Sequence, residues 1–293
     1  MKVISTNCLD DKQRLVAEKL IRQVQNFDGT HRTPYLSNSL NFDEKMPAFF
    51  LGYEDGHLVA LLTVYADSPA EAEVAIMVHP DFRQKGYARQ LFHVFRETLQ
   101  DYHLEFVVMS ERAFLAKNPD LLPNLGMKLD DDFEYWLARD RQFYPVDNQK
   151  ELSVTPAQKE HLEAIAEFQS QGFGESYEVA LHYAKAALAD KTGRLYIVMK
   201  DQKVLASCTV DFSTEYNYFY GLAVAESYRG QGIGTYFMKV LVNALVAENE
   251  KSFQIAVESD NLAAKRLYER VGFEEQTQVV YAKVTDASKL WEI

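Results

Sequence analysis

The chain has 293 residues, 47% of them apolar and 25% charged, which is enough for two ordinary domains with a hydrophobic core each. Its 31 basic and 43 acidic residues leave a net charge of −12, so we expect neither nucleic acid nor a membrane as partner, because both bind basic patches. No stretch has the apolar length of a signal peptide or of a membrane span, and we therefore expect a cytoplasmic protein.

The two halves of the chain predict the same succession of elements. Each begins with an amphipathic helix and continues with a hairpin, a strand, a glycine-rich turn that opens a helix, a further strand, a short helix and a last strand. The second half adds a helix at Tyr177 to Ala189, and Thr155-Pro156 is expected to open its first helix. This succession indicates an α/β fold, a mixed sheet with helices on both faces. The predicted bounds are Gln13 to Val24 and Ala157 to Gln169 for the first helices, Phe49 to Tyr53 with Leu58 to Tyr65 and Leu195 to Lys200 with Val204 to Phe212 for the hairpins, and Glu105 to Met109 and Phe253 to Val257 for the later strands.

The sequence repeats itself at an offset of 146 residues, the distance from Arg83 to Arg229. The offset holds without a slip from the first strands to the last, and a period this long indicates a duplicated domain and not a solenoid. We therefore predict two tandem domains, 1–145 and 146–293. Other residues that recur at this offset are Val78 and Val224, Leu99 and Leu245, and Gly126 and Gly272.

The stretch from Tyr218 to Val246 indicates a site for an anion. A β-branched and aromatic run leads through Arg229-Gly-Gln-Gly-Ile-Gly234 into a helix, so glycines let the backbone approach an anion while the N–H groups of the helix start point at it. Arg229 adds a positive charge. A P-loop would need Lys and then Ser or Thr after the last glycine, where this chain has Thr235 and Tyr236, and a dinucleotide fingerprint has another spacing.

This loop resembles the pyrophosphate loop of the GNAT acetyltransferases. A second segment, Asn261 to Phe273, is similar to that family's other signature, N-x-x-A-x-x-x-Y-x-x-x-G-F. The resemblance implies two tandem GNAT-like domains, each a mixed, mostly antiparallel twisted sheet flanked by helices. It covers nearly the whole chain, strongly in the second half and partially in the first, so the resemblance implies a catalytic domain at 146–293 and a degenerate one at 1–145.

The resemblance also implies acetyl-CoA as co-substrate and assigns the residues that hold it. Tyr268 takes the role of general acid for the departing thiolate, with a plain core aromatic as the alternative. Asn261 matches a residue that caps the short helix and touches the cofactor. Lys265 matches a contact to the 3′-phosphate, with a solvated helix face as the alternative. The residues expected at pantetheine and pyrophosphate are Leu222, Ala223, Val224, Arg229, Gly230, Gln231, Gly232, Ile233, Gly234 and Thr235.

No residue can be assigned as the general base from the sequence. The position matched to a catalytic glutamate in some relatives is Ala256, which argues against a direct carboxylate there. The remaining candidates are the carboxylates Asp211, Glu215 and Glu258, or a water relay from Tyr216 or Tyr218.

The first half departs from the family pattern. Leu122 stands where the second half has Tyr268, and Leu115 stands in place of Asn261. Pro119 and Pro123 interrupt the expected short helix. The loop from Arg83 to Ala88 keeps its anion-binding pattern, which leaves open a bound but unreactive CoA or a purely structural domain. These two readings are not separable from the sequence.

The expected function is an N-acetyltransferase that acts by direct attack of a primary amine of a small molecule or peptide on acetyl-CoA. The alternative is a protein that binds or senses acetyl-CoA without turnover. No metal is expected, because Cys8 and Cys208 form no C-x-x-C pair and the histidines are scattered. A monomer and a homodimer are both compatible with the sequence, and the acceptor amine has no signature in it.

Overall fold

Residues 146 positions apart resemble each other in backbone conformation as well as in sequence. The computed structural model describes residues 1–146 and 151–291, and each hairpin, glycine turn and long helix of the first half has a counterpart in the second. Left-handed backbone recurs at equivalent positions, with φ of +50° at Asp55 and +48° at Asp201, and +66° at Gly126 and +79° at Gly272. The duplication therefore extends to individual turns.

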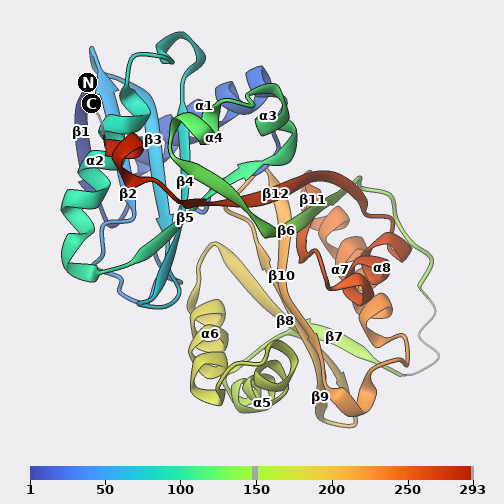
Figure 1. The fold of residues 1–293 in the computed structure, drawn as a ribbon. Coiled ribbons are helices and arrows are strands. Elements are labelled where there is room, and N and C mark those ends of the chain that lie inside the picture. Colours follow the sequence, from blue (N-terminus) through green and yellow to red (C-terminus); the bar gives the residue numbers. More distant parts are fainter. Residues whose placement is uncertain (147–150, 292–293) are drawn as a thin grey trace. The chain divides into compact units, whose positions relative to one another are not determined.

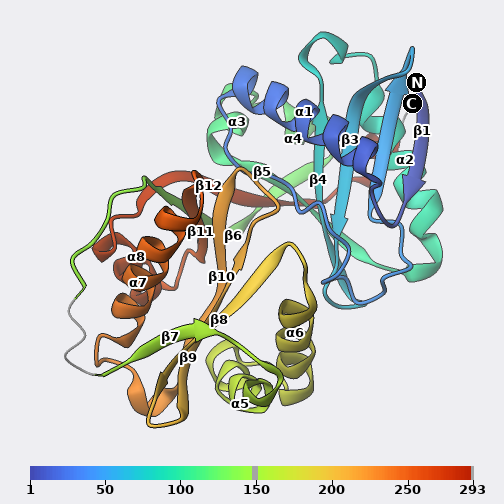
Figure 2. The same ribbon diagram turned by 180° about the vertical axis from the view of Figure 1, so that it is seen from behind.

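The chain divides into two compact units (Figures 1 and 2). Unit 1 comprises Met1–Glu134 and Thr277–Ile293, and unit 2 comprises Tyr135–Gln276. This division differs from the contiguous domains 1–145 and 146–293 that the repeat predicts, because the last segment of the chain completes the first unit. Each unit is described separately below.

The sheet of unit 1 is mixed. Its neighbours are antiparallel except for one parallel pair, β4 with β5. The strand order is β1 (Lys2–Thr6), β2 (Phe49–Glu54), β3 (His57–Tyr65), β4 (Glu71–Val78), β5 (Glu105–Glu111) and β12 (Glu274–Val284). The helices are α1 (Asp11–Asp28), α2 (Tyr87–Leu99), α3 (Arg112–Lys117), α4 (Leu121–Asn124) and α9 (Ala287–Trp291), with short 3₁₀ turns at Pro80–Phe82 and Gln100–Tyr102.

Unit 2 has the same plan. Its one parallel pair is β10 with β11, and the hairpin strands are antiparallel. The strand order is β6 (Met127–Arg139, in this unit from Tyr135 on), β11 (Ser252–Glu258), β10 (Tyr216–Val224), β9 (Lys203–Asp211), β8 (Gly193–Lys200) and β7 (Ser153–Pro156). The helices are α5 (Leu162–Phe173), α6 (Tyr177–Ala189), α7 (Ile233–Glu248) and α8 (Leu262–Arg270), with 3₁₀ turns at Lys159–His161 and Glu226–Tyr228.

Helices cover both faces of each sheet, as the sequence predicts. In unit 1, α1 and α2 lie on opposite faces of the sheet (Figures 1 and 2). Alternate residues of β2 point to opposite faces, so Phe49 packs with α1 and Phe50 packs with α2. In unit 2, α7 packs on Phe219 and Phe253, while α5 and α6 pack on Ile197. The mixed and mostly antiparallel α/β architecture is confirmed in each unit.

The last strand of each unit comes from the other half of the repeat. At the 146-residue offset β12 is the counterpart of β6, yet β12 and not β6 pairs with β5, with Val280 opposite Ser110 and Ala282 opposite Val108. The sheet of unit 2 correspondingly ends with β6 beside β11. The two halves have exchanged their final strands.

The start of the second half differs from the prediction. Thr155 and Pro156 do not open a helix but lie in the edge strand β7, paired with β8, and α5 begins later, at Leu162. Proline is tolerated there because an edge strand has one side without ladder bonds. The added helix α6 and the interrupted helix of the first half, split into α3 and α4, are confirmed.

Candidate active site

Each sheet opens into a V at the carboxyl end of its parallel pair. In unit 2, β10 and β11 are paired from Tyr216 with Ser252 to Phe219 with Ile255, and the ladder ends there although both strands continue. In unit 1 the ladder of β4 and β5 ends at Val74. The backbone edges beyond these points are available to an extended ligand, which the added-strand binding of pantetheine requires.

The glycine-rich loop of unit 2 forms an anion cradle at the start of α7. Gly232 is the N-cap of the helix with φ of +80°, and a Cβ added there meets no atom within 4 Å. The first helical bond at this end runs from the Tyr236 N–H to the Gly232 carbonyl at 3.0 Å, so the N–H groups that precede it have no acceptor within the helix. This geometry suits a phosphate.

Arg229 is fixed beside this cradle. Its Nε donates to the Val224 carbonyl at 2.9 Å, which holds the guanidinium at the end of β10. Among the described residues no carboxylate pairs with it, and its side chain is exposed. The positive charge at the loop of unit 2 is therefore available to an anion.

Gly234 has a different role from the other loop glycines. It is buried, and a Cβ there would lie 2.7 Å from Leu267 Cδ1 and 3.6 Å from Val224 Cγ2. The residue thus permits the close approach of α7 to α8. This geometry gives Gly234 a packing role, and its contact with the anion stays a prediction.

A β-bulge interrupts β10 just before the loop. Its register with β9 shifts between Tyr220 and Ala223, and Gly221 has φ of +61°. A bulge breaks the ladder locally and redirects backbone groups. Gln169 on α5 supports the bulge, since its Nε2 donates to Ser207 Oγ at 3.0 Å and to the Gly221 carbonyl at 3.4 Å. The sequence reasoning missed both residues, although a glycine inside a strand is a known bulge signal.

The predicted pantetheine residues follow directly after the bulge. Ala223 pairs with Ser207 and Val224 with Ala206 on β9, so their other edge faces the opening of the V. Leu222 is part of the bulge itself. The three residues predicted from the sequence thus lie together at the edge of the opening and beside the loop.

Tyr268 lies in α8 with its side chain 6% exposed. Its ring meets Phe273 edge to face at 6.2 Å, so it is a core aromatic in terms of packing. Burial, and secondarily the neighbouring thiol of Cys208, raises the pKa of the Tyr268 hydroxyl above its ordinary value. A tyrosine hydroxyl is protonated at neutral pH even at its ordinary pKa, so this one carries a proton.

The other predicted residues of α8 are engaged in local contacts. Asn261 caps the helix, with its Oδ1 accepting from the Ala264 N–H at 3.1 Å. Lys265 Nζ lies 2.7 Å from Glu269 Oε1 and 4.7 Å from the centre of the Tyr135 ring. The capping role of Asn261 is as predicted, and Lys265 is already occupied by neighbours on its own unit.

The candidate bases lie at different places around the parallel pair of β10 and β11. Asp211 accepts from the Ser213 N–H at 2.7 Å and from its hydroxyl at 2.8 Å, and it pairs with Tyr218, on the closed side. Burial raises the pKa of Asp211. Tyr218 stacks on Trp136 at 5.5 Å and on Tyr220 at 6.3 Å, a row of rings that the sequence did not indicate. Glu215 and Glu258 are exposed.

The loop of unit 1 repeats the geometry but not the charge. Gly86 is the N-cap of α2 with φ of +79°, and Arg83 Nε donates to the Val78 carbonyl at 3.1 Å. Here, however, Asp28 takes the guanidinium in a bidentate pair, at 2.8 and 2.6 Å. The side chain of Asp28 is only 8% exposed.

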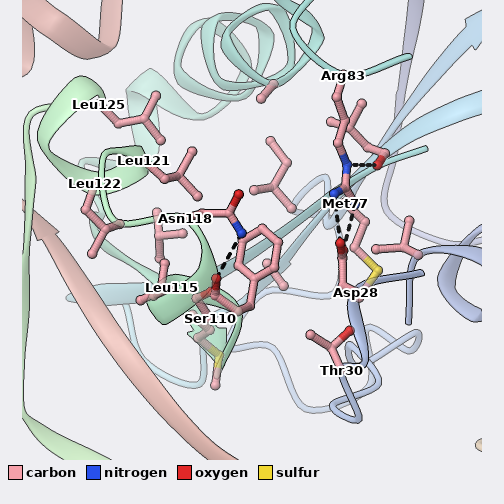
Figure 3. Close-up of a pocket in the computed structure, with 18 of the residues that line it drawn as sticks. Asp28, Thr30, Met77, Arg83, Ser110, Leu115, Asn118, Leu121, Leu122 and Leu125 are labelled. Carbon is pink, nitrogen blue, oxygen red and sulfur yellow. Dashed lines mark hydrogen bonds and ion pairs between the residues drawn. The ribbon is translucent and has the colours of Figure 1, made fainter. Parts of the chain in front are cut away.

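A cleft of about 520 Å³ lies behind this loop in unit 1 (Figure 3). It fills the V between the diverging ends of β4 and β5. Leu115, Leu121, Leu122 and Leu125 gather on one side of it, and the Arg83–Asp28 pair lies on the other. The sequence reasoning assigned this half the lesser role and did not foresee the cleft.

A half-buried carboxyl, Glu73, lies on β4 of the same unit. Burial raises its pKa to about 7; Glu134 and other carboxylates add to the rise, and Arg32 opposes it. Tyr281 on β12 is hydrogen-bonded to Glu134, and burial also raises the pKa of that hydroxyl. This group could not be predicted from the sequence, because its members come from different strands and a loop.

Metal ligation and membrane insertion find no support in the described part of the chain. Residues 1–146 and 151–291 contain no group of three or more His, Cys, Asp or Glu able to hold a metal ion. Over the same residues no helix has the length and apolarity to cross a bilayer. Cys8 is exposed and Cys208 is buried, both as free thiols.

The sequence matches the family described as "Acetyltransferase (GNAT) family" over residues 17–115 and 161–273. None of the curated proteins matches the chain. Among solved structures, a GCN5-related N-acetyltransferase from Sphaerobacter thermophilus is similar with a TM-score of 0.70 and 17% identity, over 96% of this chain and 95% of that one. A tandem GNAT protein from the clavulanic acid biosynthesis pathway has a TM-score of 0.63 and 17% identity, over 97% and 98%. A GNAT-family acetyltransferase from Colwellia psychrerythraea has a TM-score of 0.60 and 19% identity, over 97% and 100%.

Proposed function

The chain belongs to the acetyltransferase (GNAT) family, and from that premise we propose that it transfers an acetyl group from acetyl-CoA to a primary amine of a small molecule or peptide. The family match in both halves and the similarity to a tandem GNAT protein confirm the expected fold of two tandem GNAT domains. We assign the transfer to unit 2, and we propose that it uses no metal ion. Unit 1 is then the degenerate partner.

The observation that carries this assignment is the state of the loop arginine. Arg229 in unit 2 has a guanidinium that no described carboxylate neutralises, beside an N-cap glycine with room around it. The equivalent Arg83 in unit 1 is paired to Asp28 on both edges of the carboxylate. An anion with two phosphates is stabilised by the first arrangement and not by the second.

The residues of unit 2 supply positioning and proton transfer in this proposal. Acetyl-CoA supplies an acetyl group activated as a thioester. The loop from Arg229 to Thr235 holds the diphosphate, with Gly234 keeping α7 close to α8, and Leu222, Ala223 and Val224 hold the pantetheine by backbone bonds. Tyr268 carries its proton at neutral pH, as any tyrosine does, and would protonate the departing sulfur. Water or a group on the acceptor removes the amine proton.

The competing proposal is a protein that binds acetyl-CoA without turnover. The two are separated by release of free thiol from acetyl-CoA in the presence of polyamines, amino acids, aminoglycosides and peptides with a free N-terminus. Thiol release that depends on one acceptor class supports the enzyme. Binding of CoA without acceptor-dependent release, across the whole panel, supports the sensor.

The assignment to unit 2 is tested with two matched variants. Arg229→Gln is expected to lower CoA affinity at least tenfold, about 1.4 kcal/mol, and to abolish most thiol release. Arg83→Gln removes the same charge from unit 1 and is expected to leave both nearly unchanged. Titration calorimetry and the thiol assay measure the two effects. The reverse ranking of the variants would show that unit 1 is the reactive unit.

A further inference from the structure

Unit 1 contains a cleft that the proposed transfer in unit 2 leaves without a role. We propose that it is a second ligand site, which takes an uncharged, largely apolar small molecule with a hydrogen-bond donor, and from which the Asp28–Arg83 ion pair excludes coenzyme A. The inference rests on the proposed function only in assigning the glycine-rich loops to the diphosphate of coenzyme A.

Loop shape does not keep a diphosphate out of unit 1. φ is +79° at Gly86 and +80° at Gly232, and an added Cβ on either glycine meets no atom within 4 Å. Each of the two is the N-cap of a long helix, α2 or α7. The difference between the loops therefore lies in their side-chain charges.

Asp28 already neutralises the Arg83 guanidinium that a diphosphate would need as its counter-charge. Its two carboxylate oxygens accept from Arg83 Nη1 at 2.8 Å and Nη2 at 2.6 Å (Figure 3), and the guanidinium carbon lies 5.4 Å from the centre of the Phe27 ring. With Nε bonded to the Val78 carbonyl at 3.1 Å, Arg83 is held on two edges and one face. A diphosphate at Gly86 would meet a buried carboxylate beside an arginine that is already paired.

Unit 2 has no counterpart of this carboxylate. At the 146-residue offset, the position of Asp28 is Gly174, the C-cap of α5 with φ of +72° and open space around it. In unit 1 the helix α1 continues through Asp28, and its C-cap is Gly29. One additional helical residue therefore brings a carboxylate to the loop arginine.

The walls of the cleft are largely apolar. They include Met77, Phe92, Leu115, Leu121, Leu122 and Leu125, and Figure 3 shows four leucines of α3, α4 and the residues around them together on one side. Leu122 stands where unit 2 has Tyr268, so the hydroxyl proposed for proton transfer has no equivalent here. A volume of about 520 Å³ lies within the range of small-molecule sites.

The polar groups of the wall include a buried carboxylate. Glu111, at the end of β5, is 5% exposed, and its Oε1 accepts from the backbone N–H groups of His31 at 2.7 Å and Arg32 at 2.8 Å. Its Oε2 is buried and has no hydrogen-bond partner among the described residues. A donor on the ligand would satisfy this oxygen.

The first test uses two fluorescent probes with the same aromatic rings and the same N–H donor. N-phenyl-1-naphthylamine is uncharged, and 1-anilinonaphthalene-8-sulfonate carries a sulfonate. The protein is expected to bind the uncharged probe at one site, at least tenfold more tightly than the sulfonate. Leu122→Trp fills the cleft and is expected to weaken the uncharged probe at least tenfold. Leu129→Trp, at a position of β6 that is 43% exposed and outside the cleft wall, is the control.

The second test counts coenzyme A sites by titration calorimetry. Asp28→Asn removes the charge and keeps the side-chain shape, so it is expected to add one site per chain, and Arg83→Gln in the same chain is expected to remove it again. The amide of Asp28→Asn could keep a hydrogen bond to Arg83, so a second variant, Asp28→Gly, introduces the residue that unit 2 has at this position. Melting curves establish that each variant is folded.

The inference is overturned by several outcomes. Equal affinity of the two probes, or no effect of Leu122→Trp, would contradict the proposal that the cleft binds an uncharged ligand. If neither Asp28 variant gains a coenzyme A site, or if Arg83→Gln abolishes a site that the wild type has, the ion pair does not exclude coenzyme A from unit 1. If neither the wild-type protein nor the Arg229→Gln variant binds coenzyme A, the proposed function is contradicted. The inference about unit 1 is then still tested by whether Asp28 substitution creates a coenzyme A site.

Discussion

At the scale of single residues, Tyr268 combines packing with a retained proton. Its burial raises the pKa of the hydroxyl and also makes the ring part of the core of unit 2. The resemblance of Asn261 to Phe273 to the family signature singled it out in the sequence. Whether the hydroxyl does chemistry is a separate question from whether the ring fills space.

Tyr268→Phe separates these two contributions. We expect kcat to fall by about 10² to 10⁴, the contribution of a positioned general acid, with CoA affinity unchanged. Loss of the hydroxyl is expected to change the free energy of unfolding by about 1 kcal/mol at most. Tyr236→Phe is the control, because its hydroxyl donates to the Leu152 carbonyl at 3.1 Å and should affect stability alone. A kcat within threefold of wild type on a verified acceptor would withdraw the role.

Glu73 predicts a pH dependence of stability. Burial raises its pKa from 4.5 to about 7 in the folded protein, so its contribution to stability is complete below about pH 4.5 and is lost as the pH rises through 7. Glu73→Gln stays neutral and lacks this loss. We expect the variant to be more stable than wild type at pH 8 by about 1 to 3 kcal/mol, since one pKa unit corresponds to about 1.4 kcal/mol.

Melting temperatures measured from pH 4.5 to 8 check this prediction. The curves of wild type and Glu73→Gln should converge at the acidic end, separate as the pH rises from about 4.5 and stay apart above about pH 7. Glu71→Gln, two residues away on the same strand and exposed, is expected to run parallel to wild type. Parallel curves for Glu73→Gln as well would mean that Glu73 titrates normally.

The residues that the sequence did not reveal share one physical cause. Asp28 and Arg83 are 55 residues apart, and Glu73 owes its pKa to groups on other strands and on a loop. Such pairings arise only when distant segments fold together, and no spacing in the sequence marks them. Tyr268 and Asn261 were visible because both belong to one contiguous segment that resembles the family's second signature.

At the scale of elements, the loop glycines differ in function. Gly232 has left-handed backbone and open space, whereas Gly234 allows α8 to approach α7. The three-glycine pattern predicted the loop but not this division of roles. The helix starts and the hairpins were predictable from periodicity, while the edge strand β7 was taken for a helix start because Thr-Pro has the same appearance in both contexts.

The two glycines are expected to fail in different assays. Gly232→Ala should raise the Kd for CoA at least tenfold, about 1.4 kcal/mol, at a modest cost in stability from its positive φ. Gly234→Ala should mainly lower the melting temperature, and Leu267→Ala in the same chain should restore part of it. Gly86→Ala, with the same φ in unit 1, is the control that shares the backbone strain without the CoA effect. Unchanged CoA affinity in Gly232→Ala contradicts the cradle.

At the scale of the whole molecule, the side chains specify the exchange of the last strands. Val280 and Ala282 of β12 are buried beside β5, and the equivalent residues of β6 are Glu134 and Trp136. If β6 lay beside β5 in the same register, it would bury a carboxylate and force an indole into the space of a methyl group. The repeat alone could not reveal the exchange, because both pairings preserve the 146-residue offset.

A chain of residues 1–145 is therefore expected to be unstable, although it contains one whole repeat. It lacks β12, and its own β6 fits poorly beside β5, which leaves an open edge prone to aggregation. Circular dichroism and size-exclusion chromatography measure the outcome. The double substitution Glu134→Val and Trp136→Ala in this short chain should improve folding. A soluble, cooperatively melting 1–145 chain without these substitutions would show that β6 serves either sheet.

The exchanged strands also determine the order in which the two units can be completed during synthesis. The first strands of unit 1 precede unit 2 in the chain, but Thr277 to Val284, which close the sheet of unit 1, follow unit 2. About 150 residues separate Glu134 from the end of β12, which at about 5 to 20 residues per second is roughly 8 to 30 s of translation. Throughout that interval β5 has an unpaired edge. The unit started first is finished last, after the whole of unit 2 has been made.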